Sequence, residues 1–380
     1  MHTPPSFDLA ICGAGPVGMA LAALLVQRGV SSSGIALVDA KSIEQARRDP
    51  RTIALSYGSR QILEEAGAWP VAATPIHEIH VSRRGRFGRS LMERSEHGVD
   101  ALGYVARYGD VVAVLSELCQ RLGIATLRPA LVTGSAEDGD GVSVALEQNG
   151  VVSDIRAQLL VQAEGGLFGQ QLERAVSRDY GQSAIISWVT VDAPVAHRAY
   201  ERFTDDGPLA LLPQDDGYAL VWCVPPTRAE QLLALDDGAF LARLGDAFGG
   251  RLGRFTHTTA RLAYPLGLNA QAPGTARTVA IGNAAQTLHP VAGQGLNLGL
   301  RDAAVLARVL AQDSSPAGLI QYAKLRQADR GTTVRVTDTM ARIFTGSAPL
   351  QGVLGLSLGV LDMINPARKS LAQLMMYGRR

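Results

Sequence analysis

The sequence predicts an α/β fold in which a parallel β-sheet with covering helices is interrupted by a second, antiparallel β-sheet. A pattern of strand, glycine turn, helix and strand opens the chain, and a pattern of strand, loop and helix returns near its C-terminal end. Between these two parts the sequence changes to long alternating strands without a glycine fingerprint. The 380 residues are enough for two such domains.

The opening segment "FDLAICGAGPVGMALAALLVQRGVSSSGIALVDAK" predicts a strand, a helix over residues 16–28 and a second strand, "IALVDA". Gly13, Gly15 and Gly18 form G-x-G-x-x-G between strand and helix, and Asp39 ends the second strand. These glycines permit a tight turn, a close approach of backbone N–H groups to a pyrophosphate and close helix packing. Asp39 would accept a ribose hydroxyl. The unit therefore predicts an adenine dinucleotide site, without distinguishing FAD from NAD.

Antiparallel strands are predicted after this unit. Residues 124–163 alternate apolar and polar side chains between the turn signals "EDGDG" and "QNG", as in a meander that ends in a buried strand. Residues 180–265 contain the long strands "SAIISWVTVDA", "LALLP" and "YALVWCVPP", with Trp188 and Trp222 among them. This middle part is expected to form a different kind of domain.

A second glycine-rich stretch, "GNAAQTLHPVAGQGLNLGL", separates a predicted strand over residues 277–281 from a predicted helix over about 295–312. One NAD molecule needs one glycine fingerprint, whereas FAD is longer, and its ribityl chain and isoalloxazine need a separate part of the fold. Backbone N–H groups at the start of this helix would face the flavin pyrimidine edge and favour negative charge there. The second stretch therefore favours FAD.

Composition and charge narrow the function classes. The chain is 47% hydrophobic and 19% charged with a formal charge of +1, which argues against disorder and against nucleic-acid binding. Cys12, Cys119 and Cys223 form no CxxC pair and no metal spacing, so we expect buried thiols in a reducing cytosol and no metal site. The stretch from Leu9 has no charged residue, but glycines interrupt it, which argues against a membrane span. The preceding "MHTPPSFD" lacks the basic region of a signal peptide. These two features predict a cytoplasmic protein.

Five motifs together carry a family resemblance: "GAGPVG", "DPRTIALS", "YERFTDDGPLALLP", "YALVWCVPP" and "HPVAGQGLNLGLRDA". The chain resembles the UbiH/UbiF-type FAD-dependent ubiquinone-biosynthesis hydroxylases, the 2-polyprenyl-6-methoxyphenol hydroxylase family of class A flavoprotein monooxygenases. The resemblance implies a Rossmann-type FAD-binding domain of the glutathione-reductase-like, p-hydroxybenzoate-hydroxylase type, with an inserted antiparallel substrate domain and C-terminal helices. It implies hydroxylation of a polyprenylated phenol with O2 through a flavin C4a-hydroperoxide, with NAD(P)H as transient electron donor.

The resemblance also implies roles for individual residues. The FAD-binding set is Gly13, Gly15, Gly18, Asp39, Arg51, Arg107, Glu164, Gly282, Asn283, Pro290, Gly293, Gly295, Leu296 and Asn297. The first four would hold the ADP half, Arg51 of the D-x-R motif would reach the FAD, and the residues from Pro290 onward would surround the isoalloxazine. Two departures stand out, because Asn283 and Glu164 occupy positions where the family usually has aspartate. Arg107 would replace an arginine that is missing near Gly109.

Several residues have two interpretations. His289 and Pro290, beside the predicted flavin, are the catalytic candidates, but His289 also fits a structural role. Tyr218 and Trp222 are the substrate-binding candidates, and core packing is the alternative for the tyrosine. The run "SRRGRFGRS" fits either an anion-binding surface or a solvated hairpin.

The tail over residues 350–380 is too short in its apolar part to span a bilayer. It fits either an interfacial helix that reaches a lipid substrate on the inner face of the membrane, or a helix of the core. Two further functions stay open: a weakened homologue that acts as a scaffold in a complex with other quinone-biosynthesis enzymes, and a hydroxylase of a soluble aromatic compound.

The expected division of the chain follows from these patterns. The FAD-binding domain is expected in three parts, over residues 1–75, 101–178 and 269–340. The substrate domain is expected in two, over 76–100 and 179–268, and a C-terminal helical region over 341–380.

Overall fold

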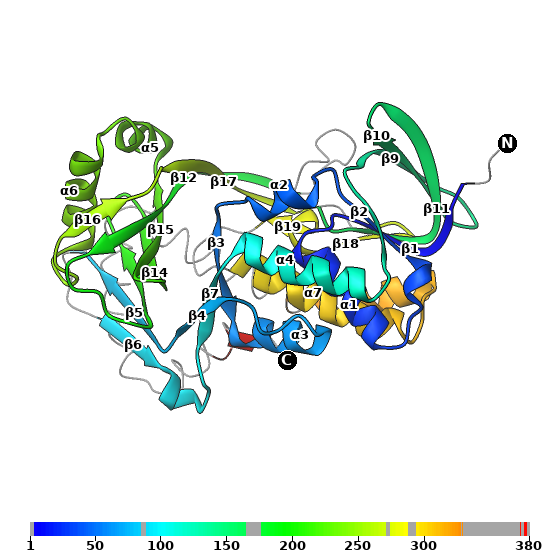
Figure 1. Cartoon of the computed structure of the whole chain (residues 1–380), viewed down its shortest axis with the longest axis horizontal. Coiled ribbons are helices and arrows are strands. Elements are labelled where there is room, and N and C mark those ends of the chain that lie inside the picture. Colours follow the sequence, from blue (N-terminus) through cyan, green and yellow to red (C-terminus); the bar gives the residue numbers. More distant parts are fainter. Residues whose placement is uncertain are drawn as a thin grey trace.

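The computed structural model describes residues 4–84, 89–164, 176–270, 274–287, 294–327, 329, 373 and 376–377. The described strands form a seven-stranded sheet, a nine-stranded sheet and a small three-stranded sheet. The two large sheets lie at opposite ends of the molecule (Figure 1).

The seven-stranded sheet has a parallel part built from five strands. Its order is β8 (Ala125–Leu127), β2 (Ile35–Val38), β1 (Ser6–Cys12), β11 (Val151–Gln162) and β18 (Thr278–Ala280). Strand β1 is central, and its residues from Leu9 onward are buried on both faces. This explains the continuous apolar run in place of an alternating pattern.

Helices cover one face of this sheet. They are α1 (Pro16–Gln27), α3 (Tyr57–Ala66), α4 (Tyr108–Arg121) and α7 (Gln294–Leu310), and α2 (Ile43–Arg47) packs against α4. Pro16 stands in the first turn of α1, where its fixed φ angle suits a helix start. Because α1 is packed against both α4 and α7, its residues are apolar nearly all round, without the usual polar stripe.

The other face is covered by an antiparallel meander. Strands β9 (Leu131–Glu137), β10 (Val142–Gln148) and the first half of β11 pair in antiparallel order. Val132, Val144 and Ile155 of the meander pack in one core cluster with Ala10 and Cys12 of β1. The predicted meander over 124–163 is thus present in part, but its first strand, β8, pairs parallel to β2.

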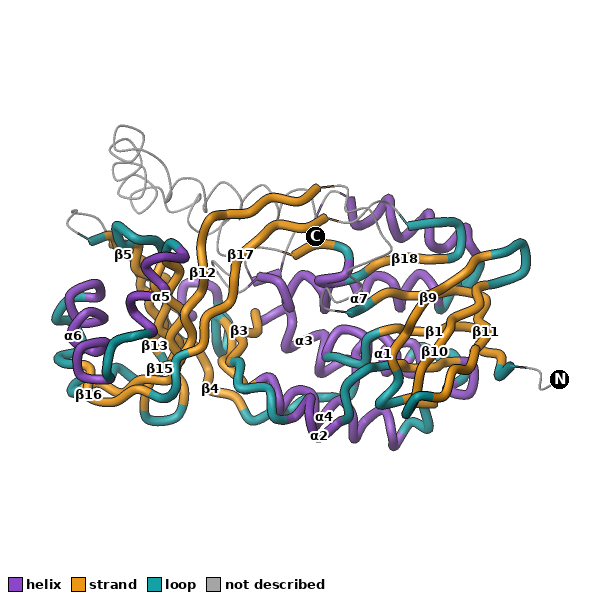
Figure 2. Tube along the Cα trace, turned by 90° about the horizontal axis from the view of Figure 1, so that it is seen from above, coloured by secondary structure: helices purple, strands orange, loops and turns teal. Residues whose placement is uncertain are grey.

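The nine-stranded sheet forms the other end of the molecule. Its order is β19 (Gln286–Thr287), β17 (Leu262–Ala270), β12 (Val176–Val191), β15 (Gly217–Val224), β14 (Pro208–Gln214), β13 (Arg198–Phe203), β5 (Glu78–Arg83) and β6 (Arg89–Glu93), with β16 (Phe255–Thr258) beside β12. Helices α5 (Pro226–Leu233) and α6 (Asp237–Phe248) cover its outer side, away from the seven-stranded sheet (Figure 1). Strands β12 and β17 run side by side toward the first sheet (Figure 2).

Between the two large sheets lies the sheet β3 (Thr52–Ser56), β7 (Gly103–Arg107) and β4 (Ala73–Ile76). Short 3-10 turns occur at η1 (Ser32–Gly34), η2 (Arg94–His97) and η3 (Gly282–Ala284). All three cysteines are buried thiols, as predicted.

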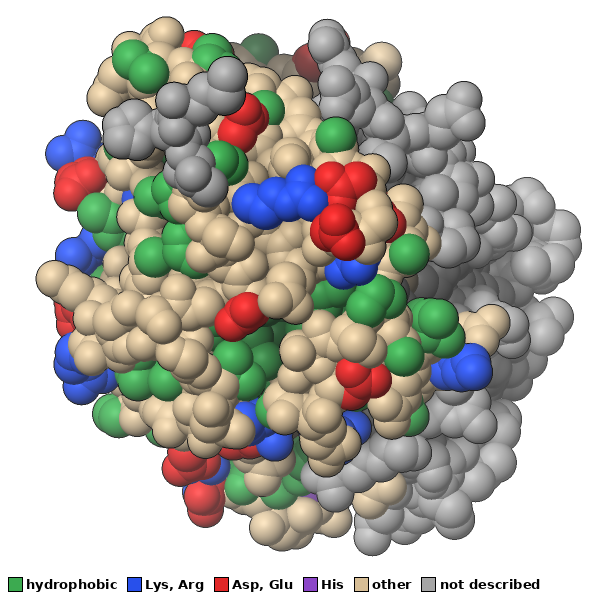
Figure 3. All heavy atoms as spheres, turned by 90° about the vertical axis from the view of Figure 1, so that its right-hand side faces the viewer, with side chains coloured by type: hydrophobic (Ala, Val, Ile, Leu, Met, Phe, Trp, Pro, Cys, Tyr) green, Lys and Arg blue, Asp and Glu red, His purple; other side chains and the backbone are tan. Residues whose placement is uncertain are grey.

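The surface agrees with the near-neutral composition. At the end of the molecule that carries β9, β10 and β11, acidic and basic side chains are interspersed with apolar ones over the described part of the face (Figure 3). Within the described ranges, no helix is both long and apolar enough to cross a bilayer.

Candidate functional site

The two glycine-rich loops, far apart in the sequence, meet around one side chain. Val17 of the first loop lies between Gly282 and Gly299 of the second stretch. A Cβ atom added to Gly299 would lie 2.7 Å from Val17 Cγ2, and one added to Gly282 would lie 3.4 Å from it. The absence of side chains at both glycines therefore lets α1 and α7 approach closely.

The first loop makes the tight turn that its pattern predicts. Gly13 has φ +112°, and a Cβ there would lie 2.6 Å from the backbone of Ala163. A Cβ at Gly18 would lie 2.0 Å from the carbonyl oxygen of Gly13. A Cβ at Gly15 would lie 3.2 Å from the hydroxyl oxygen of Tyr108. The three glycines therefore let the loop pack closely against its neighbours and leave its backbone uncovered by side chains at the start of α1.

An arginine that the sequence analysis did not single out lies beside this loop. Arg128 donates from Nε to the carbonyl of Lys41 at 2.9 Å and from Nη1 to that of Ala14 at 3.4 Å. Its Nη2 lies 3.7 Å from Oδ1 of Asp39. This nitrogen is buried and has no hydrogen-bond partner among the described residues. A buried donor without an acceptor is costly, so the position suits an anionic ligand.

Glu164 and Asp39 place two carboxyl groups near the same loop. Burial, and then the charge of Asp39, raise the pKa of Glu164 to about 7. Near neutral pH Glu164 can therefore donate a hydrogen bond as well as accept one. Asp39 keeps a backbone hydrogen bond from Lys41 at 2.8 Å.

Arg51 is connected to the first loop through Tyr108. Its guanidinium donates to both carboxylate oxygens of Asp49, at 2.9 and 2.8 Å, and lies 4.7 Å from the centre of the Tyr108 ring. Its side chain is 46% exposed, so one face stays accessible to a ligand. The hydrogen bonds of Asp49 raise the pKa of Arg51, although burial opposes this shift. The guanidinium is therefore charged under all physiological conditions.

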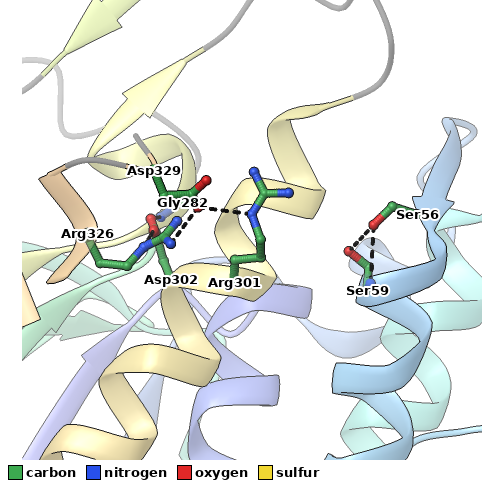
Figure 4. Close-up of polar contacts among 7 residues, drawn as sticks. All are labelled: Ser56, Ser59, Gly282, Arg301, Asp302, Arg326 and Asp329. Carbon is green, nitrogen blue, oxygen red and sulfur yellow. Dashed lines mark hydrogen bonds and ion pairs between the residues drawn. The ribbon is translucent and has the colours of Figure 1, made fainter. Parts of the chain in front are cut away.

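The second loop is held by a buried network of charged groups (Figure 4). The N–H of Gly282, whose φ is +58°, donates to Asp302 Oδ2 at 3.0 Å. Arg326 donates to Asp302 Oδ1 at 2.7 Å and to Asp329 Oδ2 at 2.5 Å. Arg301 also donates to Asp329 Oδ2, at 3.2 Å. The loop is thereby attached to α7 from within the core.

Asn297 attaches the start of α7 to β3. Its Oδ1 accepts from the N–H of Ser56 at 2.8 Å, and its Nδ2 donates to the carbonyl of Ala54 at 2.9 Å. The side chain is thus engaged with protein, which leaves the backbone at the start of α7 as the part that can meet a ligand. Asn283 is exposed, and its Oδ1 lies 3.6 Å from a Cβ built on Gly295. Leu296 packs against the core of the helical layer.

The structure corrects the expectation for Arg107. Its guanidinium forms an ion pair with Asp215 Oδ2 at 2.5 Å, in the turn between β14 and β15, and its side chain is 58% exposed. Arg107 therefore bridges β7 to the nine-stranded sheet, and its side chain makes no hydrogen bond or ion pair with the described residues of the first loop.

The structure also corrects the two substrate-binding candidates. Tyr218 and Trp222 are each 1% exposed and belong to the core between the nine-stranded sheet and its helices. The Tyr218 hydroxyl accepts from the N–H of Val195 at 2.9 Å and donates to its carbonyl at 3.0 Å. The Trp222 ring packs against Phe240 of α6. Both side chains point to the outer face of the sheet, where a substrate has no access.

Some sequence predictions fall outside the described residues. These are the roles of His289, Pro290 and Gly293, and nearly all of the tail. The hairpin predicted around the arginine run is present as β5 and β6, and its tip over 85–88 lies outside the described ranges.

The described residues fit a long, doubly anionic cofactor. One end has bare glycine backbone, a carboxylate and a buried arginine nitrogen that has no hydrogen-bond partner among the described residues. The other end has the start of α7, whose first backbone N–H groups have no partner within the helix. Val17 of the first loop lies against Gly282 and Gly299 and so connects the two ends of the site.

Comparison with known proteins agrees with this arrangement. The model of a family described as "FAD binding domain" matches residues 6–329. The chain is 33% identical to the ubiquinone hydroxylase UbiL of Rhodospirillum rubrum over 381 residues, which cover 95% of this chain and 87% of that protein. It is 31% identical to the 3-demethoxyubiquinol 3-hydroxylase of Escherichia coli over 320 residues, which cover 80% of this chain and 79% of that protein.

Solved structures show the same fold. The p-nitrophenol 4-monooxygenase PnpA of Pseudomonas putida matches the whole chain with a TM-score of 0.78 at 17% identity, and 100% of both chains is covered. The anhydrotetracycline hydroxylase OxyS of Streptomyces rimosus matches 98% of this chain and 76% of that chain with a TM-score of 0.71 at 19% identity. The predicted fold class is thus confirmed.

Proposed function

The chain belongs to the FAD binding domain family, and from this premise we propose that it is an FAD-dependent monooxygenase that hydroxylates the aromatic ring of a polyprenylated phenol in ubiquinone biosynthesis. The observation that carries the proposal is the meeting of the two glycine loops around Val17, because FAD needs both a pyrophosphate site and a flavin site. The similarity to ubiquinone hydroxylases supports the substrate class.

In this proposal FAD lies across the two loops. Asp39 binds the adenosine ribose, and Arg128 donates a hydrogen bond from Nη2 to the cofactor near the first loop. Arg51 binds a phosphate oxygen, with its guanidinium held by Asp49. Glu164 hydrogen-bonds a hydroxyl or phosphate group of the cofactor.

The flavin half lies on the second loop. Gly282 and Asn283 meet the ribityl chain, and backbone N–H groups from Gly295 to Asn297 meet the pyrimidine edge of the flavin. A neutral amide at Asn283 accepts a ribityl hydroxyl with a weaker bond than a carboxylate, by about 1 kcal/mol. The N-terminus of α7 would stabilise negative charge on a bound flavin.

The chemistry follows from the cofactor. When bound, FAD carries two electrons from NAD(P)H to O2, and one oxygen atom enters the ring while the other leaves as water. The protein binds and orients the ring, and its apolar walls exclude water from the reacting atoms.

The visible spectrum of the purified protein is the first test. We expect a yellow protein with the absorption bands of bound flavin, NAD(P)H oxidation that a polyprenylphenol accelerates, and a product that carries one oxygen atom from labelled O2. A colourless protein that excess FAD does not reconstitute would favour the scaffold function. A flavoprotein that hydroxylates a water-soluble phenol but no polyprenylphenol would identify a soluble aromatic substrate.

A membrane contact is part of this proposal, because the substrate class is lipophilic. The sequence over residues 350–380 combines an apolar run with Arg368, Lys369, Arg379 and Arg380, a composition suited to an anionic lipid surface. We also propose association with other quinone-biosynthesis enzymes, because they would share the same lipophilic substrates. Replacement of the four basic residues by glutamine should reduce co-sedimentation with anionic liposomes, and unchanged binding would exclude this contact.

A further inference from the structure

The nine-stranded sheet has two unlike faces. On its outer face Leu209, Leu211, Tyr218, Leu220 and Trp222 are buried in the core under α5 and α6. The alternate residues point to the inner face, since successive side chains of a strand lie on opposite sides. Six of those residues are apolar and only half-buried: Ile79, Val81, Ala210, Leu212, Val221 and Ile186. Ala199, Ala219 and Cys223 on the same face are buried. The inner face is therefore an apolar surface that other described residues cover only in part.

The inner face adjoins the proposed flavin site. Gln214, at the end of β14, accepts a 2.9 Å hydrogen bond from Thr52 Oγ1 of β3. The same strand β3 is bonded to Asn297 at the start of α7. Along β14 the inner-face positions then run from Gln214 through Leu212 to Ala210. With a rise of about 3.3 Å per residue, Ala210 lies roughly 13 Å from Gln214.

One carboxyl group, that of Glu201, lies among the apolar residues of the inner face. Glu201 of β13 is opposite Ala210 of β14 and opposite Val81 of β5. Its neighbours Tyr200 and Arg202 point to the outer face, where Tyr200 packs on Phe248 and Arg202 donates to the carbonyl of Ala247. Glu201 makes no hydrogen bond or ion pair with the described residues. An apolar wall therefore carries one acid that no described group neutralises.

Charged and titratable groups near Glu201 are few. On the inner face Arg83 lies two positions beyond Val81 on β5, and Cys223 lies two positions beyond Val221 on β15. The charge of Glu201 contributes to the raised pKa of the Cys223 thiol, after burial, so both groups share this face. Burial raises the pKa of Glu201 to about 7. A carboxylate with this pKa is a better base near neutral pH than an ordinary glutamate.

We propose that Glu201 is the catalytic residue that accepts the hydrogen bond, and then the proton, of the phenol hydroxyl of the substrate. This inference rests on the proposed function. The aromatic ring packs on the inner face near Ala210 and Val221, and its hydroxyl group supplies a hydrogen-bond donor, which none of the described residues provides to Glu201. An apolar surface with one well-placed polar group is the usual composition of a small-molecule site.

The step balances without a further reagent. The phenol O–H bond breaks, its proton moves to a Glu201 carboxylate oxygen, and its electron pair increases the electron density of the ring. The ring carbon then accepts the oxygen atom that the bound cofactor delivers. The hydrogen on that carbon leaves as a proton, which enters the water formed from the second oxygen atom, and this loss restores the aromatic ring. Glu201 returns its proton to the phenol oxygen. Glu201 thus ends the cycle as the carboxylate.

The test compares binding of 2-geranylphenol and its methyl ether to the FAD-loaded protein. The ether fills the same space but has no hydroxyl proton. Dissociation constants come from the change in the visible spectrum of bound FAD, at about pH 5.5 and about pH 8.5. The variants are Glu201→Gln, which keeps the shape of the side chain, and Glu230→Gln, a matched control at an exposed glutamate of α5.

We expect the wild-type protein to prefer the phenol about tenfold at the higher pH, as a charge-assisted hydrogen bond predicts. The preference should fall at the lower pH, where Glu201 is protonated. Glu201→Gln should show a small preference that does not change with pH, and Glu230→Gln should match the wild type. The limb near pH 7 in the pH profile of kcat/KM should disappear with Glu201→Gln alone.

Two results overturn the inference while the proposed function stands. One is that the wild-type protein prefers the phenol over its methyl ether to the same extent at both pH values. This result can be interpreted without a variant. The other is a pH-dependent preference that Glu201→Gln retains in full. If the FAD-loaded wild type binds neither probe, the phenol hydroxylase function itself fails, and the inference fails with it.

Discussion

The backbone N–H of Gly282 donates a 3.0 Å hydrogen bond to Asp302 Oδ2, which joins the second glycine loop to the middle of α7. Asp302 is fully buried, and Arg326 balances its charge from the other side. The conformation of the loop therefore depends on ion pairs that are buried in the core.

Replacement of Arg326 should destabilise the fold strongly. In Arg326→Met, Asp302 and Asp329 lose the cation that both of them contact. Breaking a buried ion pair on one side costs about 3–5 kcal/mol, because a buried charge is left uncompensated. Urea unfolding followed by circular dichroism measures the change. Arg254→Met is the control, since its ion pair with Asp192 is exposed and should contribute less than about 1 kcal/mol. Equal losses in the two variants would contradict this account of the network.

Gly299→Ala should weaken FAD binding, although alanine is the better helix former by about 1 kcal/mol. The added Cβ meets Val17 at 2.7 Å, and overpacking of this kind costs about 1–3 kcal/mol. The double variant with Val17→Ala should recover most of the loss. Gly250→Ala is the control, because no atom lies within 4 Å of a Cβ at that position. Fluorescence titration of the apoprotein with FAD gives the four dissociation constants. A double variant as weak as Gly299→Ala would show that Val17 does not couple the loops.

Arg128→Met should reduce FAD affinity by about tenfold to a hundredfold, the value of a charge-assisted hydrogen bond to a ligand. Arg156→Met is the matched control, since Arg156 pairs with Asp138 on the surface. The same fluorescence titration measures both variants, and thermal melting of the apoproteins checks that each is folded. FAD affinity equal to that of the wild type would exclude Arg128 from the cofactor site.

Glu201 should make stability depend on pH in a defined direction. Its pKa rises from 4.5 to about 7 on folding, so the unfolded chain loses this proton first as the pH increases. The wild type should therefore lose stability relative to Glu201→Gln between about pH 4.5 and 7, by about 3 kcal/mol in full above that range. Urea unfolding of both proteins at a series of pH values measures the difference. A difference that does not change with pH, or that grows toward acid, would contradict the burial of this carboxyl group.

The parts of the fold that follow from local sequence were predictable. Gly13, Gly18 and Pro16 determine the first turn through backbone geometry alone, and the helix begins where the pattern places it. The first strand and the second strand of the opening segment are also present, as β1 and β2. Cysteine burial followed from the absence of any pairing or metal spacing.

What depends on tertiary packing was missed. The sequence of β15 is apolar throughout, so it does not say that α5 and α6 cover the face of Tyr218 and Trp222. These helices were not predicted, although Asp236 caps α6 by accepting from Ala239 N–H at 2.8 Å, a signal present in the sequence. Arg128 is far from both glycine loops in the sequence, so nothing local marked it. Glu201 lies in the motif "YERFTDDGPLALLP", and the sequence alone does not show that its side chain points to an apolar face.

The path of the chain through the nine-stranded sheet has a consequence for protein engineering. Strands β5 and β6 enter the sheet from an early segment, and β12 to β17 enter it from a later one, with β7 and the meander between them. Glu201 pairs with both groups, through Val81 on one side and Ala210 on the other. A chimera intended to change substrate choice must therefore exchange both segments together. If the longer segment alone were exchanged, β5 and β13 would come from different proteins. The mismatch would lie at Glu201 and Val81, on the surface that is proposed to bind the ring.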